Sequence, residues 1–181
     1  VLCLLVRDER EELATYFATR CDVRDVRDAV FEGWDEKGIV VRETSTLIMA
    51  SEHGYLEIVQ TLLARGADVN QSEEYEGDTA LHLASRNGYI EVVRTLLEAG
   101  AGADVRRANR NSFTPISHAC EGKHIEVFRA LVEAGGDVDT LDSDGWTALH
   151  DASWHGFTEG VRYLVERGAD VNKSTTNEDG D

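Results

Sequence analysis

Thr79-Ala80-Leu81-His82-Leu83-Ala84-Ser85 is the most informative stretch of this 181-residue chain, because variants of it recur three times. The other copies begin at Ser45, Thr114 and Thr147, so successive starts lie 34, 35 and 33 residues apart. In every copy an apolar pair ends 18 residues after the start, whereas the distance from that pair to the next copy varies. Helical pairs of constant length explain this pattern, since one extra residue rotates a helix by ~100° and an exposed loop tolerates insertion.

This pattern resembles the ankyrin repeat, a turn followed by two antiparallel helices with the signature T-P-L-H-x-A. The resemblance covers residues 44–172 and implies an all-α fold, an ankyrin-repeat α-solenoid with short β-hairpin or turn loops. The signature positions are Thr79, Leu81, His82, Thr114, Pro115, Thr147, Leu149 and His150. In the family the imidazole of the signature bridges backbone groups of neighbouring turns, which implies structural roles for His82 and His150.

The repeats divide the chain into seven segments. We expect a degenerate N-terminal repeat or cap over 1–23, a long insert over 24–43 and a disordered acidic tail over 174–181. The four signature-bearing repeats are expected over 44–77, 78–112, 113–145 and 146–173.

The insert has two interpretations. Val23–Val30 carries valines at the spacing of one short helix, and Ile39–Val41 favours extended backbone. The segment could be a local elaboration that packs Phe31 and Trp34 against the first helices. The alternative is a binding loop, because long loops in compact arrays are often functional.

Glycine is expected to end most of the first helices. Gly54, Gly88 and Gly156 fall where a left-handed cap is needed, and glycine adopts that conformation at little steric cost. The third repeat has Lys123 at this position, which predicts either a strained turn or a turn shifted by one residue.

Composition limits the classes of partner and compartment. Asp and Glu number 35 against 18 Lys and Arg, a net charge of −17 that repels nucleic acid and anionic membranes. We therefore expect a protein or peptide partner with basic segments, no nucleic acid, no membrane, and a monomer. Three cysteines without a C-x-x-C pair favour a reducing, intracellular compartment, either cytoplasmic or nuclear.

The sequence predicts no catalytic, cofactor or metal site, because no nucleophile, base and orienting group are placed to converge. Cys120 takes a small-residue position of the signature, which favours a buried thiol. Asp142 and Asp144 flank a turn at Gly145, where turn chemistry explains them. A calcium loop starting at Asp142 would need a late glutamate ligand, and Ser153 stands there instead.

The resemblance locates binding in a concave groove made of hairpin tips and the exposed side of the first helices. The expected partner-binding residues are Tyr75, Glu76, Asp78, Arg86, Arg110, Asn111, Phe113, Glu121, Asp144, Trp146, Trp154 and His155. Phe113, Trp146 and Trp154 should lie near one another, and exposed aromatic and arginine side chains most often anchor interfaces. The alternative is that an aromatic residue before the signature Thr packs on the adjacent hairpin.

Charge along the repeats is uneven. Residues 79–113 carry a net +2, between 44–78 at −6 and 114–146 at −5. One hypothesis is a groove that accepts a partner of mixed charge, with an acidic group near Arg110. The simpler interpretation is that these arginines are solvated surface residues.

Two asparagines are candidate modification sites. Leu62–Asn70 and Leu164–Asn172 both read L-x(5)-D-V-N, which resembles the asparagine hydroxylation sites of ankyrin proteins. An ordinary turn role for Asn70 and Asn172 is the alternative.

These patterns together predict a non-enzymatic scaffold or adaptor domain that binds a partner segment in its groove. Two other functions stay open. One is the substrate-recognition module of a ubiquitin ligase, similar to Fem-type or SOCS-box ankyrin proteins. The other is the regulatory ankyrin domain of a larger enzyme or channel.

Overall fold

The computed structural model describes residues 30–34, 40–101, 105–135, 138–142 and 144–174, with side chains from Thr46 onward. The expected N-terminal repeat at 1–23 lies outside these residues, as do part of the insert and all but the first residue of the expected tail.

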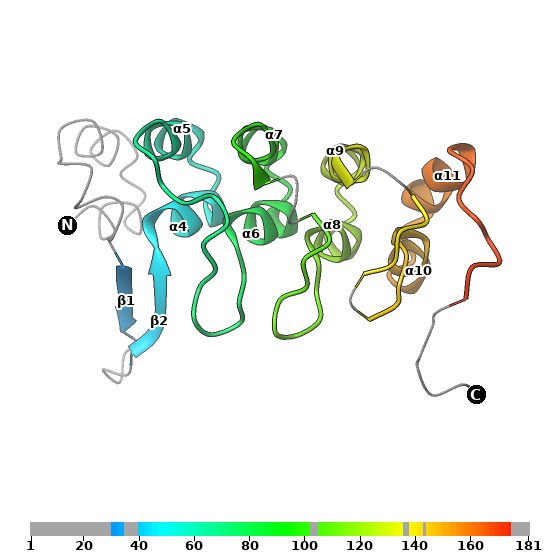
Figure 1. Cartoon of the computed structure of the whole chain (residues 1–181), viewed down its shortest axis with the longest axis horizontal. Helices are drawn as coiled ribbons and strands as arrows, with labels where there is room; N and C mark the ends of the chain where they lie inside the picture. The colour runs from blue at the N-terminus through cyan, green and yellow to red at the C-terminus, as the bar shows by residue number, and fades with distance from the viewer. Residues whose placement is uncertain (1–29, 35–39, 102–104, 136–137, 143, 175–181) are drawn as a thin grey trace.

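The helices of the described residues form two parallel rows (Figure 1). The first helices of the repeats are α4 (Thr46–Glu52), α6 (Ala80–Asn87), α8 (Pro115–Gly122) and α10 (Ala148–Trp154). The second helices are α5 (Leu56–Ala64), α7 (Ile90–Glu98), α9 (Ile125–Gly135) and α11 (Thr158–Glu166). Hairpins extend from the row of first helices on the side away from the second helices (Figure 1). The helical solenoid with hairpin loops expected from the sequence is therefore confirmed.

A two-stranded sheet precedes the first of these helices. Strands β1 (Val30–Trp34) and β2 (Val40–Ser45) pair in antiparallel register, and β2 leads directly into α4. The extended backbone predicted for Val40 and Val41 is confirmed. A short helix reaching Val30 is wrong at that residue, because Val30 pairs with Ser45 and a β-branched residue suits a strand once a partner strand is present.

The signature residues form capping boxes at the starts of the first helices. The Thr79 hydroxyl accepts the His82 N–H, and His82 Nδ1 accepts the Thr79 N–H at 3.2 Å. This arrangement satisfies two backbone donors that a helix start otherwise leaves unpaired. The same box is formed by Thr114 with Ser117 and by Thr147 with His150.

A hairpin takes the number of the repeat whose first helix follows it, and His82 connects its own repeat to the next hairpin. Its Nε2 lies 2.9 Å from the Arg107 carbonyl oxygen in the following hairpin, and since a carbonyl only accepts, Nε2–H is the donor. Burial lowers the pKa of His82 to about 4, so the ring stays neutral and keeps one donor and one acceptor nitrogen. The bridging role that the resemblance implied for His82 is confirmed.

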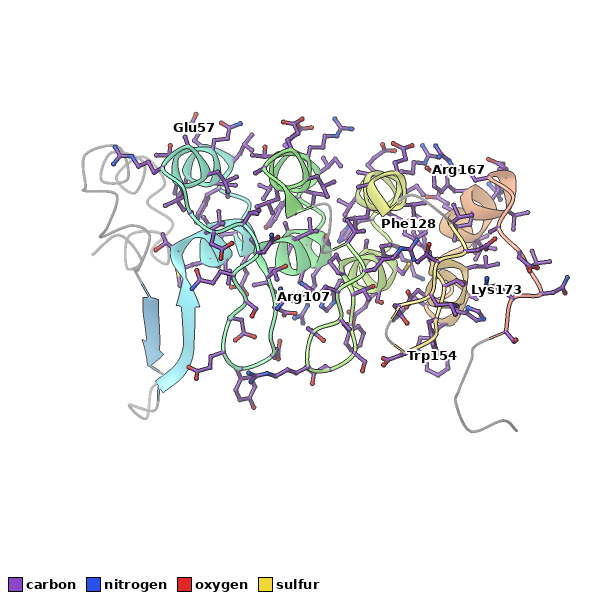
Figure 2. All side chains as sticks on the ribbon, in the orientation of Figure 1. Glu57, Arg107, Phe128, Trp154, Arg167 and Lys173 are labelled. Atoms are coloured by element: carbon purple, nitrogen blue, oxygen red, sulfur yellow. The ribbon has the colours of Figure 1, made fainter. Side chains whose placement is uncertain are left out.

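Second helices pack across the repeat boundaries through fully buried apolar side chains. Phe128 of α9 is an example: its ring meets Phe157 and Tyr163 of the fourth repeat edge-on, at centroid distances of 5.4 and 6.2 Å (Figure 2).

None of the helices within the described residues is long and apolar enough to traverse a membrane.

Each of three hairpins is closed by one polar residue at its base. Glu73, Asn109 and Asp142 donate their backbone N–H across the hairpin, at 2.8 to 2.9 Å, and their side chains accept backbone N–H groups of the tip. The turn role predicted for Asp142 is confirmed. Asn109, at the same spacing from its signature Thr as Asp142, and Glu73, in a hairpin one residue longer, have the same role.

A residue with left-handed backbone lies near the end of each hairpin tip. Gly77 and Gly145 have φ of 77° and 76°, and Ser112 has 64° at the corresponding place in the third repeat. A side chain in this conformation is strained, which glycine avoids. The third repeat therefore holds its tip at a conformational cost that the neighbouring tips do not bear.

Lys123 carries the strain that the sequence predicted. It caps α8 with φ of 55°, where Gly54, Gly88 and Gly156 have 74°, 77° and 60°. We predict that Lys123→Gly raises the free energy of unfolding by about 1 kcal/mol, because glycine adopts this conformation without a Cβ clash. Urea unfolding measures the change. Lys123→Ala is the control, since it retains the Cβ, and an equal gain from both variants would contradict the argument.

Candidate functional site

A pocket of about 280 Å³ lies between the third and fourth repeats, where two hairpins meet the ends of two first helices. The third repeat contributes Asn111, Ser112, Phe113 and Ser117 to its lining. The fourth repeat contributes Asp142, Asp144, Trp146, Asp151, Trp154 and His155. Six of the twelve residues predicted to bind a partner line this one pocket, although they are separated by as many as 44 positions in the chain.

Two tryptophans form one wall of the pocket. Trp154 is the last residue of α10, it is 76% exposed, and Figure 2 shows it on the hairpin side of that helix. Its ring lies 5.8 Å from that of Trp146 at an interplanar angle of 75°. The predicted proximity of these aromatic residues is confirmed, because Phe113 lines the same pocket.

The side chains of Phe113 and Trp146 are less exposed than that of Trp154 and contact neighbouring histidines. The Phe113 ring stacks on His118 of α8, with centroids 5.1 Å apart and planes at 8°. Trp146 is also half-buried and lies 6.1 Å from the His150 ring. Both side chains thus pack on the helix that follows them, rather than on the adjacent hairpin as the alternative proposed, and still present part of their surface to the pocket.

Asp151 is a buried carboxyl group in the wall of the pocket. It is 7% exposed, and the Ser117 side chain lines the same pocket. Burial raises its pKa from 3.8 to about 7, and the charge of Asp142 adds to this effect, while Arg106 and His118 act in the opposite direction. The group is therefore only partly ionised near neutral pH.

The pocket exists because Ser117 replaces the histidine of the signature. In the second repeat, the equivalent His82 ring spans the distance to the next hairpin and bonds to a backbone carbonyl there. The serine side chain keeps the capping box and is too short to span the corresponding gap, so it lines a pocket instead. The sequence contained this signal as a departure from the signature, Ser for His, and Asp151 where Leu83 stands in the second repeat.

Asp78 was predicted to face a partner, and that prediction is wrong because Asp78 is fully buried. Its Oδ1 accepts a hydrogen bond from Asn109 Nδ2 at 2.6 Å and lies 3.8 Å from His118 Nε2. Burial alone would raise the pKa of Asp78, but the interactions with His118, Asn109 and His82 outweigh it and lower the pKa to about 2. The carboxylate holds neighbouring repeats together and offers nothing to a partner.

The basic hairpin of the third repeat connects neighbouring hairpins. Arg110 donates to the carbonyl oxygens of Glu74 and Tyr75, the latter at 3.2 Å. Arg106 reaches Thr140 at 2.8 Å and Arg107, labelled in Figure 2, reaches Asn70 at 3.3 Å. Arg107 and Arg110 are thus exposed, as the simpler interpretation predicted, and also hydrogen bond to backbone of neighbouring hairpins. An acidic partner group near Arg110 remains a hypothesis, and it would have to share a guanidinium already bonded to backbone.

Other predicted binding residues are accessible and lie outside the pocket. Tyr75 is 73% exposed on the second-repeat tip, and Glu76 beside it is half-buried. Arg86 and Glu121, at the ends of α6 and α8, have exposed side chains. These positions extend the candidate surface from the pocket along the hairpin side of the solenoid.

A thiol and a cluster of carboxylates, which could in principle react or bind a metal ion, have structural roles instead. Cys120 is a fully buried free thiol whose pKa burial raises, which confirms the predicted core role. Glu73, Glu76 and Asp78 offer carboxylate oxygens within 4.8 Å of one another. Both Glu73 oxygens accept backbone N–H groups of the hairpin, which explains this cluster without a metal ion.

The candidate hydroxylation sites share one local geometry. Asn70 and Asn172 are exposed, and each donates its backbone N–H to the Asp two residues earlier, at 3.0 and 2.9 Å. This confirms a turn role for both. Their modification remains a prediction.

Stacked helix pairs with projecting hairpins define a repeat protein in which each unit contacts its neighbours and the array presents an extended surface. The family model described as ankyrin repeats (3 copies) matches residues 2–109 and 101–175. The chain belongs to the ankyrin repeat family, whose members generally mediate protein–protein interaction and are generally not catalytic.

Similar curated proteins differ widely in their overall architecture. The chain is 43% identical over 68 residues to mouse ankyrin repeat and SAM domain-containing protein 6, covering 37% of this chain and 8% of that protein. It is 35% identical over 146 residues to human ankyrin repeat and SOCS box protein 6, covering 76% and 34%. It is 41% identical over 58 residues to human protein phosphatase 1 regulatory subunit 27, covering 32% and 36%. The chain thus spans about a third or less of these relatives.

Proposed function

We propose that this chain is a non-catalytic scaffold or adaptor module that binds a protein segment containing basic residues along its hairpin side. The observation that carries the proposal is the placement of Tyr75 and Trp154, exposed at 73% and 76%. Tyr75 is on a hairpin tip, and Trp154 lines a pocket. Aromatic side chains that the fold does not bury are common anchors of protein interfaces.

Charge supports a basic partner and a monomeric module. A net charge of −17 attracts basic segments, repels nucleic acid and anionic membranes, and opposes self-association. The partner would be met in the cytoplasm or nucleus, where free thiols such as Cys120 persist.

Replacing Trp146 and Trp154 together by alanine is expected to remove partner proteins that the wild-type chain captures from cell extract. Val165→Ala is the matched control, because Val165 is an exposed apolar residue of the second-helix row, at 47%. Quantitative mass spectrometry of captured proteins compares the three baits. A single Trp154→Ala variant guards against misfolding, since Trp154 is mostly exposed. Capture that survives in every tryptophan variant would overturn the proposal.

One specific observation favours a second candidate function, the substrate-recognition module of a ubiquitin ligase. The match to the SOCS box protein extends over 76% of this chain, more than the matches to the SAM-domain or phosphatase relatives. The hairpin side would then bind the protein to be ubiquitinated. A cullin-binding segment elsewhere in the full-length protein distinguishes this role from that of a scaffold.

A further inference from the structure

We infer that the pocket between the third and fourth repeats holds the guanidinium group of an arginine side chain of the partner. The inference deepens the proposed function and rests on it, because it specifies one side chain within a bound segment. Three features of the pocket carry it: its aromatic wall, its carboxyl groups and its size.

The aromatic wall suits a planar cation. Trp146 and Trp154 meet edge to face at 5.8 Å, and both contribute to the lining. Tryptophan is the strongest aromatic partner for a cation within about 6 Å of the ring. A guanidinium also stacks on such rings, which an ammonium group does not do.

Carboxyl groups complete the site on the side of the fourth repeat. Asp142 and Asp144 belong to the hairpin, and Asp151 lies behind them on α10, more than nine-tenths buried. Asp142 Oδ1 already accepts the N–H groups of Asp144 and Trp146, which fixes the orientation of its carboxylate. Oxygens from separate carboxylates match the several N–H donors of one guanidinium, so arginine is favoured over lysine.

The size of the pocket selects one side chain. Its volume of about 280 Å³ is at the lower end of small-molecule sites, which run from roughly 300 to 1,000 Å³. Trp154, which lines it, is 76% exposed on the hairpin side of α10 (Figure 2), where a partner segment would pass. One extended side chain can enter while its backbone stays in the groove.

Protonation of Asp151 couples the site to pH. With a pKa of about 7 the carboxyl group is largely protonated at pH 6 and largely ionised at pH 8. The charged groups that face it are Asp142 from the hairpin, His118 from α8 and Arg106 from the preceding loop, and the Cys120 thiol of α8 is also close enough to sense its charge. Cation affinity should therefore rise between pH 6 and pH 8 by up to about tenfold.

Titration of the 181-residue chain with the tripeptide acetyl-Gly-Arg-Gly-amide tests the inference. The indole N–H signals of Trp146 and Trp154 in two-dimensional NMR report binding at the pocket. We expect both signals to move with the arginine probe. Two control tripeptides replace the arginine by lysine or by uncharged citrulline. The lysine probe should bind more weakly than the arginine probe, and the citrulline probe should bind at least about tenfold more weakly.

Three variants separate the pocket from the general negative charge of the chain. Asp151→Asn should weaken the arginine probe and flatten its pH dependence, whereas Glu159→Gln removes the same charge on α11 and should change neither. Ser117→His restores the signature residue and should fill the pocket, so that the arginine probe no longer moves the indole signals. His155→Gln keeps the carboxylates and should keep the pH dependence.

Equal affinity for the arginine and citrulline probes would overturn the inference, as would equal losses in Asp151→Asn and Glu159→Gln. Failure of the inference is distinguishable from failure of the proposed function. If the arginine probe does not bind and Trp154-dependent capture persists, only the inference fails. If capture also survives the tryptophan replacements, the groove itself is not the binding surface.

Discussion

Asp151→Asn should make the protein more stable at pH 8, by about 2 to 4 kcal/mol. The wild-type carboxyl group is buried, and its pKa is raised to about 7 from 3.8. At 1.36 kcal/mol for each pH unit between the two values, ionising this group in the folded chain costs at most about 4 kcal/mol. Asparagine has nearly the same shape and carries no charge, so the cost disappears.

The dependence of this stability gain on pH shows whether ionisation of Asp151 causes it. Between about pH 4 and 7 the folded state binds the Asp151 proton more tightly than the unfolded state does, so the contribution of Asp151 to stability falls as pH rises through this range. Urea unfolding at pH 5, 6.5 and 8 should show the gain from Asp151→Asn growing with pH. A gain that is the same at all three pH values would contradict the explanation.

Asp78→Ala should lower the free energy of unfolding by about 3 kcal/mol at neutral pH. The fully buried carboxylate accepts the Asn109 side chain and lies 3.8 Å from His118, so its removal leaves two buried polar groups of the next repeat without this partner. Removing the acceptor of a buried hydrogen bond to a carboxylate costs several kcal/mol, since the remaining polar groups stay desolvated.

Acid should reduce the difference between wild type and Asp78→Ala. The folded-state pKa of about 2 lies below the ordinary 3.8, so the stabilisation is complete above about pH 4 and is lost as pH falls toward 2. Thermal unfolding at pH 7 and pH 3 measures this. Glu74→Ala is the control, because Glu74 is an exposed carboxylate on the same hairpin. Equal effects of the two substitutions would show that burial of Asp78 is irrelevant.

The helix pairs could be predicted from sequence because their determinants are local and repeated. A capping box requires residues three positions apart, so Thr79 and His82 reveal it without knowledge of the fold. The left-handed helix ends at Gly54 and Gly88 follow from the same spacing, and Lys123 was recognised as strained because the other copies have glycine there. Repetition also placed Trp146 and Trp154 on one surface.

Contacts between repeats could not be predicted, because they depend on which side chains adjacent units bring together. Asp78 occupies a tip position that is half-buried in the next two repeats, and it is fully buried because Asn109 and His118 happen to be placed to receive it. Ser117 was visible as a departure from the signature, whereas Asp151 occupies a position that the signature leaves open. Their joint effect, a pocket with a carboxyl wall, required knowing that they face each other across a repeat boundary.

Ser112 shows what replacing the unusual residues of the third and fourth repeats would do. It borders the pocket with a φ of 64°, where sister tips have glycine. Together with Ser117, which stands where two other copies have histidine, it places two departures from the other copies beside Asp151. Substituting the residues that two other copies have, glycine for Ser112 and histidine for Ser117, would yield a more stable array. The same substitutions would fill the pocket, so a change that raises the thermal stability of this module would also weaken its binding of a partner.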